Sequence, residues 1–554
     1  MFRILSSRAK RTNRGADLRD TPRSALSSVK LKATVAQLIR HAWLSALACL
    51  SGAFLVFSAP VYSQTGEAPP PSPNSTEKKT DDTSGKTTQQ TATAPQSDSS
   101  DSSAEPKKPE PPPAYKLLRY EEDYSFLKDP ARRTDFWDPI KYIPFWGWDD
   151  WYLSFGGDIR ERFEFYRNQD AGSGPGDANG DNGYMLQRYM LHLDAHLGRY
   201  IRLYGEYVSG LEDGRIGGPR PQIDQDVFDV HQAFADFMLP LRSEHDSLMF
   251  RVGRQEFEYG SGRLIDLRDG PTLRLSFDSA RMLLHTHDWQ IDSWWAKPVD
   301  DNPGVCDDVS DPHQSFWGLY ATHPLPIVKD AGIDLYYLGF ENHHAVYAQG
   351  AGYELRNSLG TRIWGKPKPW EFNLEYVWQF GSFGSGEIEA WTAANAIRYN
   401  FSDLPLKPRV GIRFDIASGD DNPKSPNLNT FNPLFPSGVY FNLLNPVGPL
   451  NMIDLHPTID LYLSKKITFS FDWDFFWRES LGDGVYRISG SVLRPAGGSA
   501  RYVGNSPAFT LGWNATRHAS ILAQYVHFFP GPFFEQNPPD RETDYLTTWL
   551  SYKF

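Results

Sequence analysis

The chain has 554 residues, of which 14% are aromatic, a formal net charge of −12 and a mean hydropathy of −0.50. That hydropathy is too polar for a helical membrane protein, and after Gln64 no uncharged apolar run approaches the roughly 20 residues that a membrane helix needs. A closed β-barrel with a polar lumen and aromatic rims is compatible with both values. Three ordinary soluble domains would also fit the length.

The N-terminus has the pattern of an export signal. Residues 1–41 carry ten Lys or Arg against two Asp, and an uncharged apolar run over 42–59 follows. Residues 61–63 offer a cleavage site, so we predict a signal peptide over 1–63; a single-pass membrane anchor is the alternative. Cleavage changes the formal charge from −12 to −20 and leaves Cys306 as the one cysteine, which cannot form an internal disulfide.

Two segments separate this signal from the rest of the chain. Residues 64–113 are rich in Pro, Ser, Thr and charged residues and almost lack apolar ones, which predicts a disordered linker. Residues 114–150 are aromatic and interrupted by proline, and we expect an ordered periplasmic segment folded against the mouth of a barrel.

From residue 151 to the C-terminus the sequence repeatedly alternates between apolar and polar residues, as strands with one apolar face do. Residues 152–166, 371–381 and 409–417 follow this pattern, and 467–478 is the clearest case, with six large apolar residues at alternate positions. The chain ends on Phe554, as expected for a last strand that must pair with the first, because an unpaired edge is not tolerated in a bilayer.

These patterns predict an all-β fold, a transmembrane antiparallel β-barrel over 151–554 with 18 strands, or 16 as the alternative. The stretches rich in Gly, Asn and Pro at 170–183, 210–226, 298–314 and 418–451 are the predicted extracellular loops. In an up-and-down barrel they fall on alternate connections.

Residues 251–263 read RVGRQEFEYGSGR, and Arg268, Arg274 and Arg281 follow closely. Together with 356–362, 379–381, 414–420 and 430–435, this stretch resembles the alginate export family of outer-membrane barrels. The resemblance implies an 18-stranded barrel with an electropositive constriction that passes an anionic uronate polysaccharide out of the periplasm. The segments 64–113 and 114–150 have no counterpart in that pattern.

An anion pathway needs guanidinium groups that face a water-filled lumen, where carboxylates can pair with them and still move on. Arg254 falls on the outward face by alternation, so we predict a bulge near Gly253 that turns it inward. The alternative is that these side chains pair across the lumen as a stabilising ladder with no transport role. Alternation and the resemblance together give the predicted substrate path as Arg160, Arg162, Arg188, Arg251, Arg254, Arg263, Arg274, Arg356, Arg362 and Arg413, with Asp278 and Asp415 of opposite charge.

Other chemistry has little support in the sequence. Asp177–Gly183 (DANGDNG) hints at a calcium loop, but its glycine is one place late and Arg188 stands where a bidentate Glu belongs, which favours an ordinary turn-rich loop. GxSxG, HExxH and Gly-rich phosphate-loop motifs are missing from the sequence. We therefore expect no catalytic residue, no metal, no cofactor and no nucleic-acid partner.

Three functions remain open. The first is an outer-membrane exporter of an anionic polysaccharide in a Gram-negative bacterium, in contact with outer-membrane lipid and periplasmic export components. The second is a diffusion porin for small anionic solutes, and the third is an outer-membrane enzyme built from Ser, His and Asp on distant strands. A monomer is the expected state, with a trimer as the alternative.

Overall fold

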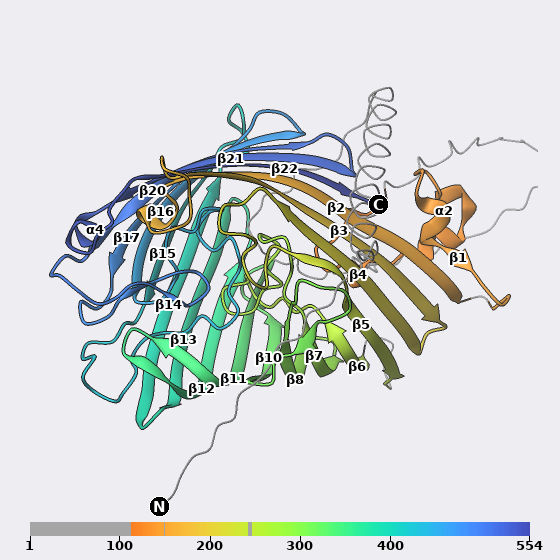
Figure 1. Cartoon of the computed structure of the whole chain (residues 1–554). Helices are drawn as coiled ribbons and strands as arrows, with labels where there is room; N and C mark the ends of the chain where they lie inside the picture. Colours follow the sequence, from red (N-terminus) through yellow and green to blue (C-terminus); the bar gives the residue numbers. More distant parts are fainter. Residues whose placement is uncertain (1–111, 149, 242–245) are drawn as a thin grey trace, which may run out of the picture. The chain divides into compact units, whose positions relative to one another are not determined.

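The computed structural model describes residues 112–148, 150–241 and 246–554 (Figure 1). The predicted signal peptide and residues 64–111 of the predicted linker lie outside the described residues. No helix in the described part of the chain is both long enough and apolar enough to cross a membrane.

One closed barrel of 18 antiparallel strands makes up most of the described chain, which confirms the predicted fold class and the preferred strand number. Each strand pairs with its neighbour in sequence, and β2 also pairs with β22. The barrel strands are β2 (Trp151–Arg167), β3 (Asp181–Leu197), β4 (Ile201–Asp213), β5 (Asp226–Pro240), β6 (Ser247–Gln255), β7 (Phe277–His285), β8 (Gln290–Asp300), β10 (Gln314–Pro324), β11 (Ala331–Tyr347), β12 (Gly350–Gly365), β13 (Trp370–Phe383), β14 (Gly386–Asn400), β15 (Arg409–Ala417), β16 (Met452–Tyr462), β17 (Ile467–Arg478), β20 (Tyr502–Asn514), β21 (Ala519–Pro530) and β22 (Thr543–Lys553).

The C-terminal strand closes the barrel as its sequence predicts. Asp158 of β2 lies opposite Lys553 of β22, and the register continues to Arg167 opposite Asp544. Beyond β22, the main chains of Gly157 and Phe554 exchange two hydrogen bonds of 3.0 Å each. The last residue of the chain therefore completes the seam, which leaves no free edge there.

The connections alternate between the two ends of the barrel, as an up-and-down topology requires, and the long loops all lie at one end. At that end, only β11–β12 and β13–β14 are joined by short turns. The four predicted loops all lie at the long-loop end, and the loops 256–276, 479–501 and 531–542 at the same end were not predicted. These loops hold the short elements α3 (Gln169–Gly172), β9 (Val309–Ser310), β18 (Val485–Tyr486), β19 (Val492–Arg494) and α4 (Pro532–Gln536).

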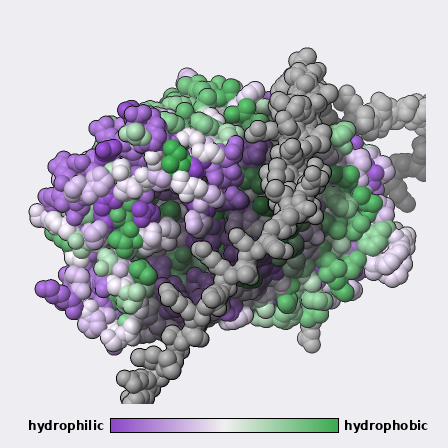
Figure 2. All heavy atoms as spheres, viewed as in Figure 1, coloured by the Kyte–Doolittle hydropathy of each residue, from purple (hydrophilic) through white to green (hydrophobic). Residues whose placement is uncertain are grey.

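The two faces of the barrel wall have the reverse polarity of a soluble protein. On β15, Val410, Ile412 and Phe414 are about half exposed on the outside, whereas Arg409 and Asp415 are buried inside. Figure 2 shows hydrophobic residues over outer faces of the strands and hydrophilic residues over the end that carries α4. Apolar side chains on the outside and charged side chains in the lumen are the arrangement that a bilayer selects.

Three inward segments narrow the lumen. The first is the segment 112–148, with η1 (Arg119–Glu121), η2 (Ser125–Lys128), η3 (Pro130–Arg132), α2 (Asp138–Lys141) and β1 (Ile143–Pro144), which pairs with β2. The others are the long loops 256–276 and 418–451, which meet where Ile265 bridges to Phe435. Phe257, Ile265 and Phe435 belong to an apolar cluster with inward residues of β7, β8, β10, β11, β13 and β14, so this side of the lumen is filled.

Candidate functional site: a basic cavity in the lumen

A cavity of about 220 Å³ lies on the side of the lumen that the apolar cluster leaves open. Its wall comes from β13–β17, β20 and β21, and its inner side from residues 261–263 and 437–443 of the two inward loops. Four arginines, Arg263, Arg398, Arg409 and Arg413, and His456 line it, together with Asp460 and Asp472. Basic side chains therefore outnumber acidic ones on the wall of this cavity.

Acidic partners hold the arginines of this cavity in place. The guanidinium of Arg413 lies 2.6 Å from the carboxylate of Asp415, and that of Arg263 lies 3.8 Å from the same carboxylate. Arg409 donates to Asp460 at 2.7 Å. A carboxylate that enters the cavity competes with these partners, so its binding is weakened and remains exchangeable.

The sequence prediction identified part of this cavity. Arg263 and Arg413 line it, and Asp415 lies directly behind them. It missed Arg398, Arg409 and His456. Arg409 could have been predicted, because alternation along β15 places it on the same face as Arg413 and Asp415.

Four other predicted arginines bind residues 269–271 of the loop 256–276 instead of lining a passage: three come from the barrel wall, and Arg274 belongs to the loop itself. Arg160 and Arg162 donate to main-chain carbonyls of residues 269–271. Arg188 and Arg274 bind the carboxylate of Asp269 at 2.8 and 2.7 Å. Burial would raise the pKa of Asp269, but Arg274, Arg188 and Arg160 hold it well below its usual range. The loop is thus fastened to the barrel wall by buried charge.

Three further arginines bind neighbouring strands or the second loop. Arg251 pairs with Asp236 at 2.6 Å and Arg362 with Asp334 at 2.9 Å. Arg356 donates to the carbonyl of Thr430 at 3.2 Å, and so holds the loop 418–451. These contacts agree with the ladder alternative for the individual residues.

The prediction for Arg254 and Asp278 is wrong. The pairing of β5, β6 and β7 runs past Gly253 without a register shift, so no bulge turns Arg254 inward. Arg254 pairs with Asp278 at 2.9 Å, in the same alternation phase as the exposed Val252. The irregularity lies one strand earlier, between β4 and β5, because the extra residue sits at His231 instead of Gly253.

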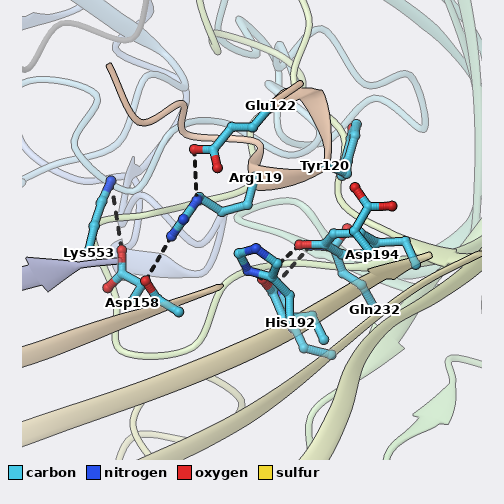
Figure 3. Close-up of polar contacts among 12 residues, drawn as sticks. Arg119, Tyr120, Glu122, Asp158, His192, Asp194, Gln232 and Lys553 are labelled. Atoms are coloured by element: carbon cyan, nitrogen blue, oxygen red, sulfur yellow. Dashed lines mark hydrogen bonds and ion pairs between the residues drawn. The ribbon is translucent and has the colours of Figure 1, made fainter. Parts of the chain in front are cut away.

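The first part of the segment 112–148, which includes η1, reaches into the lumen at the opposite end from the long loops, where Leu118 and Tyr120 pack against inward residues of β4 and β5. Arg119 points from η1 toward Asp158 on β2 and pairs with Glu122 at 2.9 Å (Figure 3). Its guanidinium donates to the carbonyls of Gly157 and Phe554 at 2.8 and 2.9 Å, across the seam that closes the barrel. This segment therefore obstructs the lumen and is fastened at the seam.

The chain is similar to several solved structures and to one protein family. Three crystal structures from Pseudomonas aeruginosa are each 11% identical to the chain: OccK8 (OprE) with a TM-score of 0.47, OpdO with 0.49, and OpdK with vanillate with 0.46. They cover 73%, 75% and 72% of this chain, each over 98% of its own length. No curated protein matches the chain significantly. The alginate export family matches residues 151–548, which is the whole barrel except its last residues. The chain belongs to the alginate export family, as an outer-membrane β-barrel channel.

Proposed function

We propose that this outer-membrane channel passes an anionic uronate polysaccharide along the basic cavity in its lumen. The observation that carries the proposal is the cavity wall, where Arg263, Arg398, Arg409 and Arg413 gather beside the remaining free volume. Guanidinium groups pair bidentately with carboxylates such as those of a uronate chain. Because their acidic neighbours compete for the same groups, a polymer can bind at several points and still slide.

The present arrangement does not admit a polymer. The cavity of about 220 Å³ is smaller than the roughly 300–1,000 Å³ of pockets that enclose drug-sized ligands. Passage of a chain therefore requires the loop 418–451 or the segment 112–148 to move. The small volume itself favours the second candidate function, a diffusion porin for small anionic solutes.

The test is the reversal potential of the purified protein in a planar bilayer under a salt gradient, with and without soluble polyuronate. Exporter function predicts anion selectivity and block by polyuronate, and both effects become weaker in Arg409→Gln. Arg167→Gln is the matched control, since Arg167 is an exposed arginine at the long-loop end of β2 and does not line the cavity. Cation selectivity would refute both candidates, whereas block by monomeric uronate without block by the polymer would favour the porin.

A further inference from the structure

Three aspartates meet at the long-loop end of the barrel. Asp226 is the first residue of β5, Asp229 follows on the same strand, and Asp308 directly precedes β9. One carboxylate oxygen from each residue lies within 4.8 Å of the others. None of these residues lines the basic cavity, so the cluster is a separate feature.

The pairing of β4 with β5 explains why two of these aspartates share one side. Asp226 and Asp229 are three residues apart, so regular alternation would place them on opposite faces. The register shifts between the pairs Val208–Asp229 and Gly210–Asp226, and this irregularity buries both carboxylates. Bulges of this kind redirect side chains and occur often beside functional sites.

The third aspartate is held against β5 by the main chain of its loop. The carboxylate of Asp229 accepts hydrogen bonds from the N–H groups of Asp307 and Asp308 at 2.7 and 3.1 Å. The main chains of Phe228 and Cys306 are also joined, by a hydrogen bond of 3.0 Å. The loop 301–308 is therefore positioned independently of any ligand, with Asp308 already beside the other two carboxylates.

The described residues compensate this group of charges only in part, because Asp229 is hydrogen-bonded and Asp226 is not. Asp226 is 0% exposed, yet neither of its oxygens accepts a hydrogen bond of normal geometry. Arg254 is the nearby cation, but it lies 4.0 Å from Asp308 while it binds Asp278 at 2.9 Å. A buried carboxylate without a partner is costly, and a bound cation removes that cost.

We propose that Asp226, Asp229 and Asp308 bind a divalent cation, with calcium preferred over magnesium. Three carboxylate oxygens are hard ligands, which suit both ions. Calcium accepts six to eight oxygens in irregular geometry and can complete its shell with water, whereas magnesium demands a near-ideal octahedron that an irregular strand and a loop do not supply. The bound ion joins the loop 301–308 to the start of β5. The ligands come from two distant segments, so no contiguous loop motif marks them.

The experiment uses the full chain, purified in detergent free of lipopolysaccharide and stripped with EDTA. Calcium binding is measured by titration calorimetry, and magnesium by competition. We expect one site, and we expect Asp226→Asn and Asp308→Asn each to weaken its affinity at least tenfold. Asp177→Asn is the control, because the Asp177 carboxylate lies in an exposed turn on another long loop and is bound by main-chain N–H groups.

Several results would overturn the proposal. They are no calcium binding by the folded wild-type protein, unchanged affinity in both variants, or a loss in Asp177→Asn equal to that in the other two. Magnesium binding as tight as calcium binding would overturn the preference for calcium. Faster migration of the unboiled protein in gel electrophoresis shows that each variant has a folded barrel. If Asp226→Asn does not fold, Asp308→Asn carries the same test, because its residue lies in a loop outside the barrel wall.

Discussion

Asp269 offers the sharpest test of how the inward loop 256–276 is held. Its carboxylate receives Arg188 at 2.8 Å and Arg274 at 2.7 Å, and Arg160 lies 3.7 Å away. All three arginine side chains are nearly fully buried. In Asp269→Asn the side chain keeps its size but loses its charge, so three buried guanidinium groups lose a common counter-charge.

The size of the effect follows from the one short contact that joins the loop to the barrel wall. Arg188 belongs to β3, whereas Arg274 belongs to the loop itself and can keep its contact with Asp269 when the loop is released. A hydrogen bond between charged groups contributes about 1.5–3 kcal/mol. The carboxylate of Asp269 is 31% exposed, which places the contact with Arg188 near the lower end of that range, about 1.5 kcal/mol, because solvent screens it. At 1.4 kcal/mol per factor of ten, the population of the released loop rises about tenfold.

Hydrogen–deuterium exchange of peptides covering 256–276 measures this population directly. We expect a loss of protection of about tenfold in Asp269→Asn and no change in Asp288→Asn, whose residue lies in an exposed short turn at the other end of the barrel. Unchanged protection in Asp269→Asn would refute the reasoning. It would mean that the carbonyl contacts of Arg160 and Arg162 alone hold the loop.

Three further changes test other parts of the fold. Arg119→Gln removes two hydrogen bonds across the seam and should make the segment 112–148 more sensitive to trypsin; unchanged cleavage would contradict that role. Burial and the charge of Arg119 lower the pKa of Lys141 to about 7, so the folded chain binds fewer protons than the unfolded chain between pH 7 and about 10. Docking of the segment should therefore strengthen as the pH rises through that window, by at most about 1.4 kcal/mol per unit, and Lys141→Met should abolish the dependence seen in exchange measurements. Gly253→Ala should prevent assembly of the barrel, judged by gel migration, because φ is +131° and the new Cβ would lie 2.2 Å from the carbonyl oxygen of Ala233; Gly205→Ala, with nothing within 4 Å, should assemble normally.

The barrel was predictable from the sequence because its signal is local. Alternation in 409–417 and 467–478 and the aromatic C-terminus required no knowledge of distant contacts. The lumen was less predictable, because alternation gives the face of a residue and not its partner. Arg160 and Arg409 both face inward, yet one holds a loop and the other lines the cavity.

Bulges mark the other limit of the prediction. The sequence placed an irregularity near Gly253, but it lies in β5, where it also brings Asp226 and Asp229 to one side. A single extra residue reverses the face of everything beyond it, and nothing in the local composition fixes its position. The loop 256–276 was missed for a related reason. Its polar and charged residues bind the barrel wall, so the loop is ordered and points inward. Its composition is that of a strand region, and the sequence therefore does not distinguish it from a strand.

Arg413 connects the proposed function to the opening of the lumen. It lines the cavity and also donates to the carbonyl of Tyr440, in the loop 418–451, at 2.6 Å. A uronate carboxylate that binds the Arg413 guanidinium displaces the carbonyl of Tyr440. Substrate binding and attachment of the loop therefore compete for the same guanidinium. Arg413→Gln should therefore raise the basal conductance while it weakens block by polyuronate, whereas Arg409→Gln, which holds Asp460 and not the loop, should only weaken the block. Equal basal conductance in Arg413→Gln and Arg409→Gln would show that substrate binding is not coupled to opening through Arg413. The element that moves would then not be the loop 418–451.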